Sequence, residues 1–198
     1  LLYLLMELEA DDANSPPHYR SHGPLVNSRG EVIRIHNRAV AAGYDVDGDG
    51  KEDLVVGGCS YQAGIAGDPT PGGGVYLLRH RGLDEEGIPV LEGPEPLEVD
   101  GFTYNRAHTN AHVFLQTEDV DNDGKKELLL AIQWHDGGRM HVLKKPPGGT
   151  GLADCGTIIP QSHPIQEWVL DLDGDGELEL TFSGSENGVG FYRKLNRE

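Results

Sequence analysis

The sequence predicts an all-β fold built from a repeated unit, and three observations support this. The pattern Asp-x-Asp-x-Asp-Gly occurs three times, starting at Asp45, Asp119 and Asp171. Each copy is followed by an acidic residue and a short apolar run, which is typical of a buried strand. The 198 residues also include 28 glycines and 12 prolines, as expected of a chain with many turns. We therefore expect short strands joined by tight loops.

Each acidic loop has the ligand chemistry of a calcium site. Alternate carboxylates in a tight turn supply hard oxygen ligands, and so many like charges repel one another without a cation. The loops are not EF-hands, because Val56, Leu130 and Phe182 stand at the twelfth position, where an EF-hand has a bidentate Glu. The acid stands at the ninth position instead. An acidic turn without metal is the alternative, and it explains one such match more easily than three.

The expected calcium ligands follow from their positions in the loop. Positions one, three, five and nine would bind through side-chain oxygens and position seven through its backbone carbonyl, with water completing the shell. Glycine at position six permits the positive φ of the turn. The sequence thus predicts three structural Ca²⁺ sites with the following ligands: Asp45, Asp47, Asp49, Lys51 and Asp53; Asp119, Asp121, Asp123, Lys125 and Glu127; Asp171, Asp173, Asp175, Glu177 and Glu179.

The strands follow the loops in a regular order. In each copy the ninth-position acid opens a second strand, and a run led by glycine then predicts a third strand, at residues 73–79, 138–143 and 188–193. The loops begin 74 and 52 residues apart, which brackets the spacing of four-stranded propeller repeats. Residues 60–71 are rich in turn formers and carry the insertion of the first copy.

These loops and strands resemble the FG-GAP and VCBS repeat family, which implies an integrin-like calcium-binding β-propeller of four-stranded blades. Under this resemblance residues 1–198 form one propeller region: the end of a preceding blade at 1–35, a blade with an insertion at 36–103, a blade at 104–161 and an incomplete blade at 162–198. Closed propellers have about four to eight blades. These three and a half blades are therefore expected to be part of a seven-bladed ring, completed by another chain or segment.

The preceding half-blade is predicted from the start of the chain. Residues 1–9 are apolar but short and flanked by acids, so they are unlike a secretion signal, and we expect them to form a third strand. Residues 23–35 would then form the fourth strand of the same blade.

Composition limits the cellular compartments and the classes of partner that we expect for this chain. The formal net charge of −17 would become about −11 with three divalent ions bound. Nucleic acid is not an expected partner because no cluster of Lys and Arg is present, and no segment has the roughly 20 apolar residues of a membrane span. Cys59 and Cys155 leave both a disulfide and free thiols open. Calcium loops of this kind suit millimolar calcium, which favours a secreted, extracellular or periplasmic protein.

Polar residues precede the first strand of each unit, where successive propeller blades would converge on one rim of the central channel. The candidate catalytic residues are His36, Arg38, Tyr104, Arg106, His108, His112 and His163. Arg and His can pair with a uronate carboxylate, and Tyr or His can move a proton. The alternative is that each is an ordinary loop residue with local hydrogen bonds.

Two functions remain open from the sequence. The rim is similar in kind to that of propeller polysaccharide lyases, which implies β-elimination on a uronate-containing polymer. Arg38, Arg106 and His163 would then neutralise the carboxylate, and the tyrosine and the other histidines would transfer the proton. The alternative is a non-catalytic propeller module that binds glycans or proteins, as adhesion and lectin-like modules do, because one fold hosts both activities. No Gly-x-Ser-x-Gly, His-Glu-x-x-His or Cys-x-x-Cys motif points to another reaction.

Overall fold

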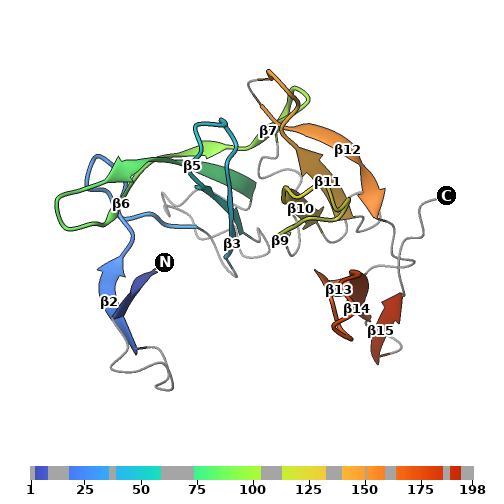
Figure 1. The fold of residues 1–198 in the computed structure, drawn as a ribbon. Coiled ribbons are helices and arrows are strands. Elements are labelled where there is room, and N and C mark those ends of the chain that lie inside the picture. The colour runs from blue at the N-terminus through green and yellow to red at the C-terminus, as the bar shows by residue number, and fades with distance from the viewer. Residues whose placement is uncertain are drawn as a thin grey trace, which may run out of the picture.

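A computed structural model describes residues 3–8, 18–35, 39–58, 74–103, 113–132, 140–149, 151–158, 164–184 and 188–192. Within these ranges the chain is all-β, without helices, and its strands pair antiparallel in separate sheets. Figure 1 shows the sheets following one another along an arc. The described part thus contains no helix of the length and apolar character needed to cross a membrane. The predicted all-β class is confirmed.

Two sheets contain four strands each, and in both the strands lie in chain order. The first sheet comprises β3 (Val40–Tyr44), β4 (Asp53–Gly58), β5 (Gly74–Leu83) and β6 (Pro89–Pro96). The second comprises β9 (Val113–Glu118), β10 (Glu127–Ile132), β11 (Met140–Lys144) and β12 (Ala153–Ile158). Each acidic loop here connects the first strand of its sheet to the second. The predicted second and third strands of both units are confirmed.

Three smaller sheets complete the described part. The third acidic loop lies in a three-stranded sheet of β13 (Pro164–Leu170), β14 (Glu179–Gly184) and β15 (Gly188–Tyr192). The other two sheets are pairs, β1 (Tyr3–Leu8) with β2 (His18–Pro24) and β7 (Glu98–Val99) with β8 (Phe102–Thr103). The predicted strand near the N-terminus therefore exists as β1.

The structure differs from the prediction of a strand over residues 23–35. Strand β2 ends at Pro24, and the chain then turns back on itself, with a bridge between Val26 and Val32. The Asn27 carboxamide oxygen accepts the backbone N–H groups of residues 29 and 31, which fixes this turn. Ile33 and Ile35 beyond it are buried against β4, β5 and β6. Hydrogen bonds between the Asn27 side chain and the nearby backbone thus form a turn where the apolar pattern predicts a strand.

Successive sheets pack face to face, so that the central strands are buried on both sides. Leu128 and Leu130 of β10 pack against Val55 of the first sheet, whereas Leu129 packs against Val169 of the next. All six residues of β10 are buried. Burial on both faces explains why the second strands read as continuous apolar runs rather than as an alternating pattern.

The first strands hold neighbouring sheets together. Strand β9 contacts both β3 and β13. Gln116 of β9 accepts the backbone N–H of Val169 at 2.9 Å, and its amide donates to the carbonyl of the same residue. Gly57 of β4 leaves room for Val113, because a Cβ there would lie 2.3 Å from the valine Cγ1. The first strands therefore make direct contacts between neighbouring sheets.

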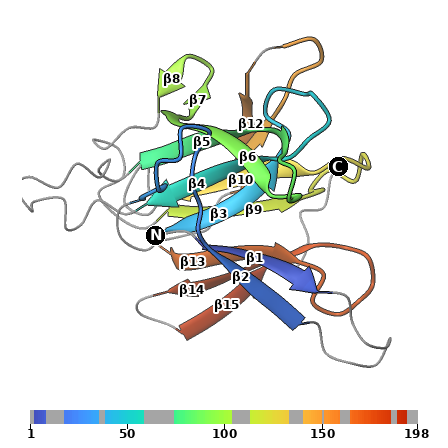
Figure 2. The same ribbon diagram turned by 90° about the vertical axis from the view of Figure 1, so that its left-hand side faces the viewer.

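The ends of the arc do not meet within the described residues. In Figure 2 the pair β1–β2 overlies the sheet β13–β15. Figure 1, turned by 90°, places these two elements on opposite sides of the molecule. No sheet in the described part closes on itself.

Candidate metal centres

The three acidic loops each occupy the same place in their sheet. They connect β3 to β4, β9 to β10 and β13 to β14, and the ninth-position acid is always the first residue of the second strand. This acid pairs across the hairpin with the residue just before the loop: Asp53 with Tyr44, Glu127 with Glu118, and Glu179 with Leu170. The hairpin therefore holds the first and ninth loop positions close together.

Three hydrogen bonds recur in every loop. The first-position carboxylate accepts the backbone N–H of the sixth residue at 2.8–2.9 Å. The fifth-position carboxylate accepts that of the seventh residue, also at 2.8–2.9 Å. The ninth-position carboxylate accepts that of the second residue at 2.9–3.1 Å. The three loops thus fold into one and the same turn.

Two positions in each loop have a positive φ. At the sixth position Gly50, Gly124 and Gly176 have φ between 82° and 85°, as predicted. At the fourth position Asn122 has φ 57°, and glycines 48 and 174 stand there in the other two loops. Asn is among the few non-glycine residues that tolerate this region. The fourth position is not among the predictions from sequence, although the set Gly, Asn, Gly is its signal.

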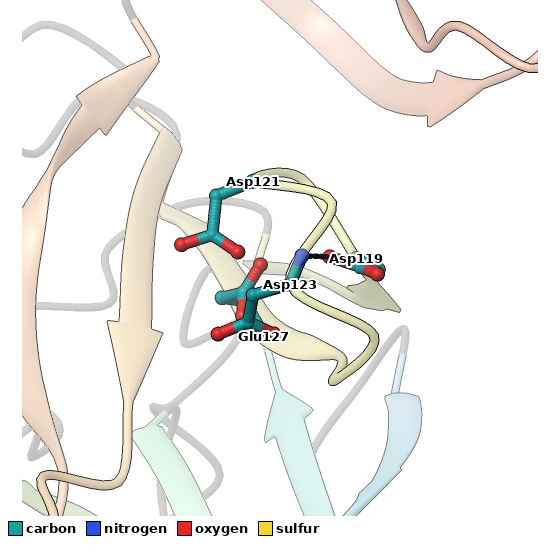
Figure 3. Close-up of side chains that lie close together, drawn as sticks. All are labelled: Asp119, Asp121, Asp123 and Glu127. Atoms are coloured by element: carbon teal, nitrogen blue, oxygen red, sulfur yellow. Dashed lines mark hydrogen bonds between the residues drawn. The ribbon is translucent and has the colours of Figure 1, made fainter.

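The turn brings carboxylates together in three groups that could hold a metal ion. Within each group, one oxygen from every member lies within 4.8 Å of the others. Figure 3 shows the second group, with Asp119 bound by the backbone of Asp123. The ninth-position acid of every group is buried, with only 1–4% of its surface exposed. The groups are Asp45, Asp47 and Asp53; Asp119, Asp121, Asp123 and Glu127; Asp171, Asp173 and Glu179.

The structure does not bring every predicted ligand into a group. Asp123 belongs to the second group, whereas Asp49 and Asp175 at the same position are not members of theirs. Asp49 instead bonds the Lys51 ammonium at 2.6 Å, and hydrogen bonds from Lys51 lower the pKa of this aspartate. The seventh-position residues Lys51, Lys125 and Glu177 donate their N–H groups within the loop. Coordination through their carbonyls stays a prediction.

Burial of the ninth-position acid creates a need for positive charge. Burial raises the pKa of Asp53, and the neighbouring Asp47 carboxylate raises it further, against the hydrogen bonds from the backbone of His80 and Val46. Arg79 and Arg81 each approach Asp47 only to 3.5 Å. A bound cation would favour the charged form of these carboxylates.

In the second group a lysine side chain lies among the carboxylates. The Lys144 ammonium hydrogen-bonds Asp121 and lies 3.0 Å from Glu127 Oε1 and 3.7 Å from Asp123 Oδ2. Burial lowers the pKa of Lys144, but the hydrogen bonds and charges of Asp121 and Glu127 outweigh it, and the net shift is upward. The donors are all oxygen atoms, and they already bind one positively charged group. The chemistry of this group therefore suits a hard cation.

The predicted catalytic residues cannot be placed. His36, Arg38, Tyr104, Arg106, His108, His112 and His163 all lie outside the described residues, as does Cys59. Cys155 is exposed. Among the histidines that the structure does place, His141 bonds Asp154 on the neighbouring strand at 2.7 Å. His80 donates its backbone N–H to Asp53. The catalytic rim therefore stays a prediction from the sequence.

No protein-family model matches this chain, and no curated protein matches it either. The FG-GAP and VCBS resemblance therefore stays a prediction.

Proposed function

We propose that this chain is a calcium-stabilised β-propeller region of the FG-GAP and VCBS type. The observation that carries the proposal is the recurrence of one hydrogen-bonded acidic turn at the same place in three successive sheets. Each group combines converging carboxylates with a buried ninth-position acid, as an ion-binding loop requires. When bound, calcium would supply the positive charge that these carboxylates share.

Calcium fits these loops better than other common metals. The donors are carboxylates without thiol or imidazole, which disfavours zinc and copper. Calcium accepts irregular shells of six to eight oxygens, whereas magnesium demands a near-ideal octahedron. The three groups differ in membership, which a tolerant ion accommodates more easily. Sites of this kind would fill in the millimolar calcium outside cells, so we propose a secreted or periplasmic location.

Several observations support the propeller arrangement. The two four-stranded sheets have their strands in chain order, stack face to face and touch along their first strands. The next sheet continues the same arc in Figure 1. Propeller blades are four-stranded sheets arranged around a central channel.

The last described sheet has an exposed apolar face that also fits this proposal. Trp168, Leu170 and Leu172 are 46%, 37% and 55% exposed. Relative to the loop, Leu170 and Leu172 stand where Tyr44 and Val46 of the first sheet pack against the sheet that follows. We propose that a further sheet of the same repeat covers this face in the complete ring.

Calorimetric titration tests the calcium assignment. We expect protein stripped with a chelator to bind about three Ca²⁺ per chain, one for each acidic group. Magnesium titrated under the same conditions should bind more weakly, because it gives up its own water reluctantly. A stoichiometry of zero would overturn the proposal, and equal binding of both ions would remove the assignment to calcium.

For the activity, we propose action on a uronate-containing polysaccharide, with glycan or protein binding as the alternative. If the chain is a lyase, Tyr104→Phe and His108→Ala should abolish turnover, because each removes a group that transfers the proton. The measurement is the ultraviolet absorbance of unsaturated uronate, with the calcium stoichiometry of each variant as its control. Full turnover in both variants would exclude this assignment of the proton-transfer residues.

A further inference from the structure

The second metal centre differs from the first in its nearest basic residue. Leu78 of β5 pairs with Leu54, and Leu143 of β11 pairs with Leu128, so that Arg79 and Lys144 occupy equivalent positions. Each directly follows the third-strand residue whose partner stands one position after the ninth-position acid. The sequence carries a signal for this position, since a basic residue stands there in all three copies, as Arg79, Lys144 and Arg193.

The two basic residues bind different partners. Arg79 bonds Glu95 at 2.6 Å through Nε and comes only to 3.5 Å from Asp47. Lys144 contacts three of the four acids of its loop, including Glu127, whose side chain is only 2% exposed. The negative charge of the two acidic groups is thus balanced by different contacts.

The neighbouring fourth strand explains the difference. Glu92, the residue paired with Arg79, accepts a hydrogen bond from Arg81, and Glu95 accepts one from Arg79, so that β6 binds both guanidinium groups in addition to their 3.5 Å contacts with Asp47. In the second sheet the residue paired with Lys144 is Ala153, which has no charge. The lysine side chain is therefore directed to the carboxylates of its own loop.

We infer that Lys144 is an internal cation of the second metal centre, which neutralises the acidic group without metal and must withdraw when a metal ion binds. The inference rests on the proposed calcium function. Two cations cannot share the same oxygens without strong repulsion. The second centre should consequently bind calcium more weakly than the first, and Lys144 should support the fold when calcium is absent.

Replacing the lysine tests the inference. Lys144→Met keeps the aliphatic length and removes the charge, and we expect it to increase the calcium affinity of the second site by about tenfold. In chelator the same variant should melt at a lower temperature than the wild type, because the carboxylates lose their counter-charge. The matched control is Lys126→Met, which removes an exposed lysine of the same loop. Calorimetric titration and thermal unfolding are the measurements.

A second variant covers the case in which Lys144→Met fails to fold in chelator. Ala153→Glu keeps the lysine and places a carboxylate on the residue paired with it, as Glu92 is paired with Arg79, so the calcium affinity of the second loop should again rise. Unchanged calcium affinity in both variants, or an equal gain in Lys126→Met, would overturn the inference. That result is distinct from failure of the proposed function, in which the wild type itself would bind no calcium.

Discussion

Removal of calcium is expected to lower the free energy of unfolding by several kcal/mol. Calcium that binds only the folded chain at 100 times its dissociation constant stabilises by about 2.7 kcal/mol per site, or about 8 kcal/mol for three independent sites. This is comparable to the whole stability of a typical domain, about 5–15 kcal/mol. Urea unfolding in excess calcium and in chelator would measure the difference. Coincident curves would rule out structural calcium.

The Glu127→Gln variant assigns part of this effect to one loop. An amide oxygen can still accept the Val120 N–H, so the turn keeps its hydrogen bond while the group loses one charge. We expect the variant to lose at most about a third of the calcium-dependent stabilisation, because competition by Lys144 makes the second site contribute less than an equal share. Glu118→Gln is the matched control, because Glu118 pairs with Glu127 across the hairpin but is outside the acidic group.

The features that the sequence predicts correctly are local ones. The turn is determined by hydrogen bonds between a carboxylate and a backbone N–H at most seven residues away. It can therefore be predicted from the spacing of Asp and Gly. The second strands can also be predicted from the sequence, because a strand that is buried on both faces has an unbroken run of apolar residues. The grouping of the carboxylates at positions one, three and nine follows from the same spacing, whereas their role as ligands stays a prediction.

The features that the sequence did not predict depend on partners in other strands. Lys144 is paired with the uncharged Ala153 and contacts the acids of the second loop, whereas Arg79 is paired with Glu92 and hydrogen-bonds Glu95. Residues 25–35 pack against β6, where the Asn27 amide donates to the carbonyl of Gly93 and the Ser28 N–H donates to that of Leu91. The predicted rim needs the starts of several first strands to converge, and its residues lie outside the described ranges. Such contacts cannot be derived from spacing along one strand.

The Leu130→Ala substitution is expected to destabilise the protein by about 2–5 kcal/mol, the usual cost of emptying a well-packed site. Leu130 has 0% of its surface exposed and lies between the first and second four-stranded sheets, with Val55 and Val75 in the same cluster. Alanine would leave a cavity at the centre of this interface. The urea midpoint of the calcium-loaded variant is the measurement. Leu83→Ala, at a side chain that is 61% exposed, is the control and should change stability by less than about 0.5 kcal/mol.

The urea dependence of the Leu130→Ala transition carries a second result. If the stacked sheets unfold as one unit, the midpoint should fall while the slope of the free energy against urea stays the same, because the same surface becomes exposed. If each sheet with its metal loop were stable alone, the variant would show a shallower slope or two transitions. We expect a single transition, because β10 is buried on both faces and loses its partners when either neighbouring sheet leaves. A small midpoint change equal to that of Leu83→Ala would contradict the assignment of this interface as the core.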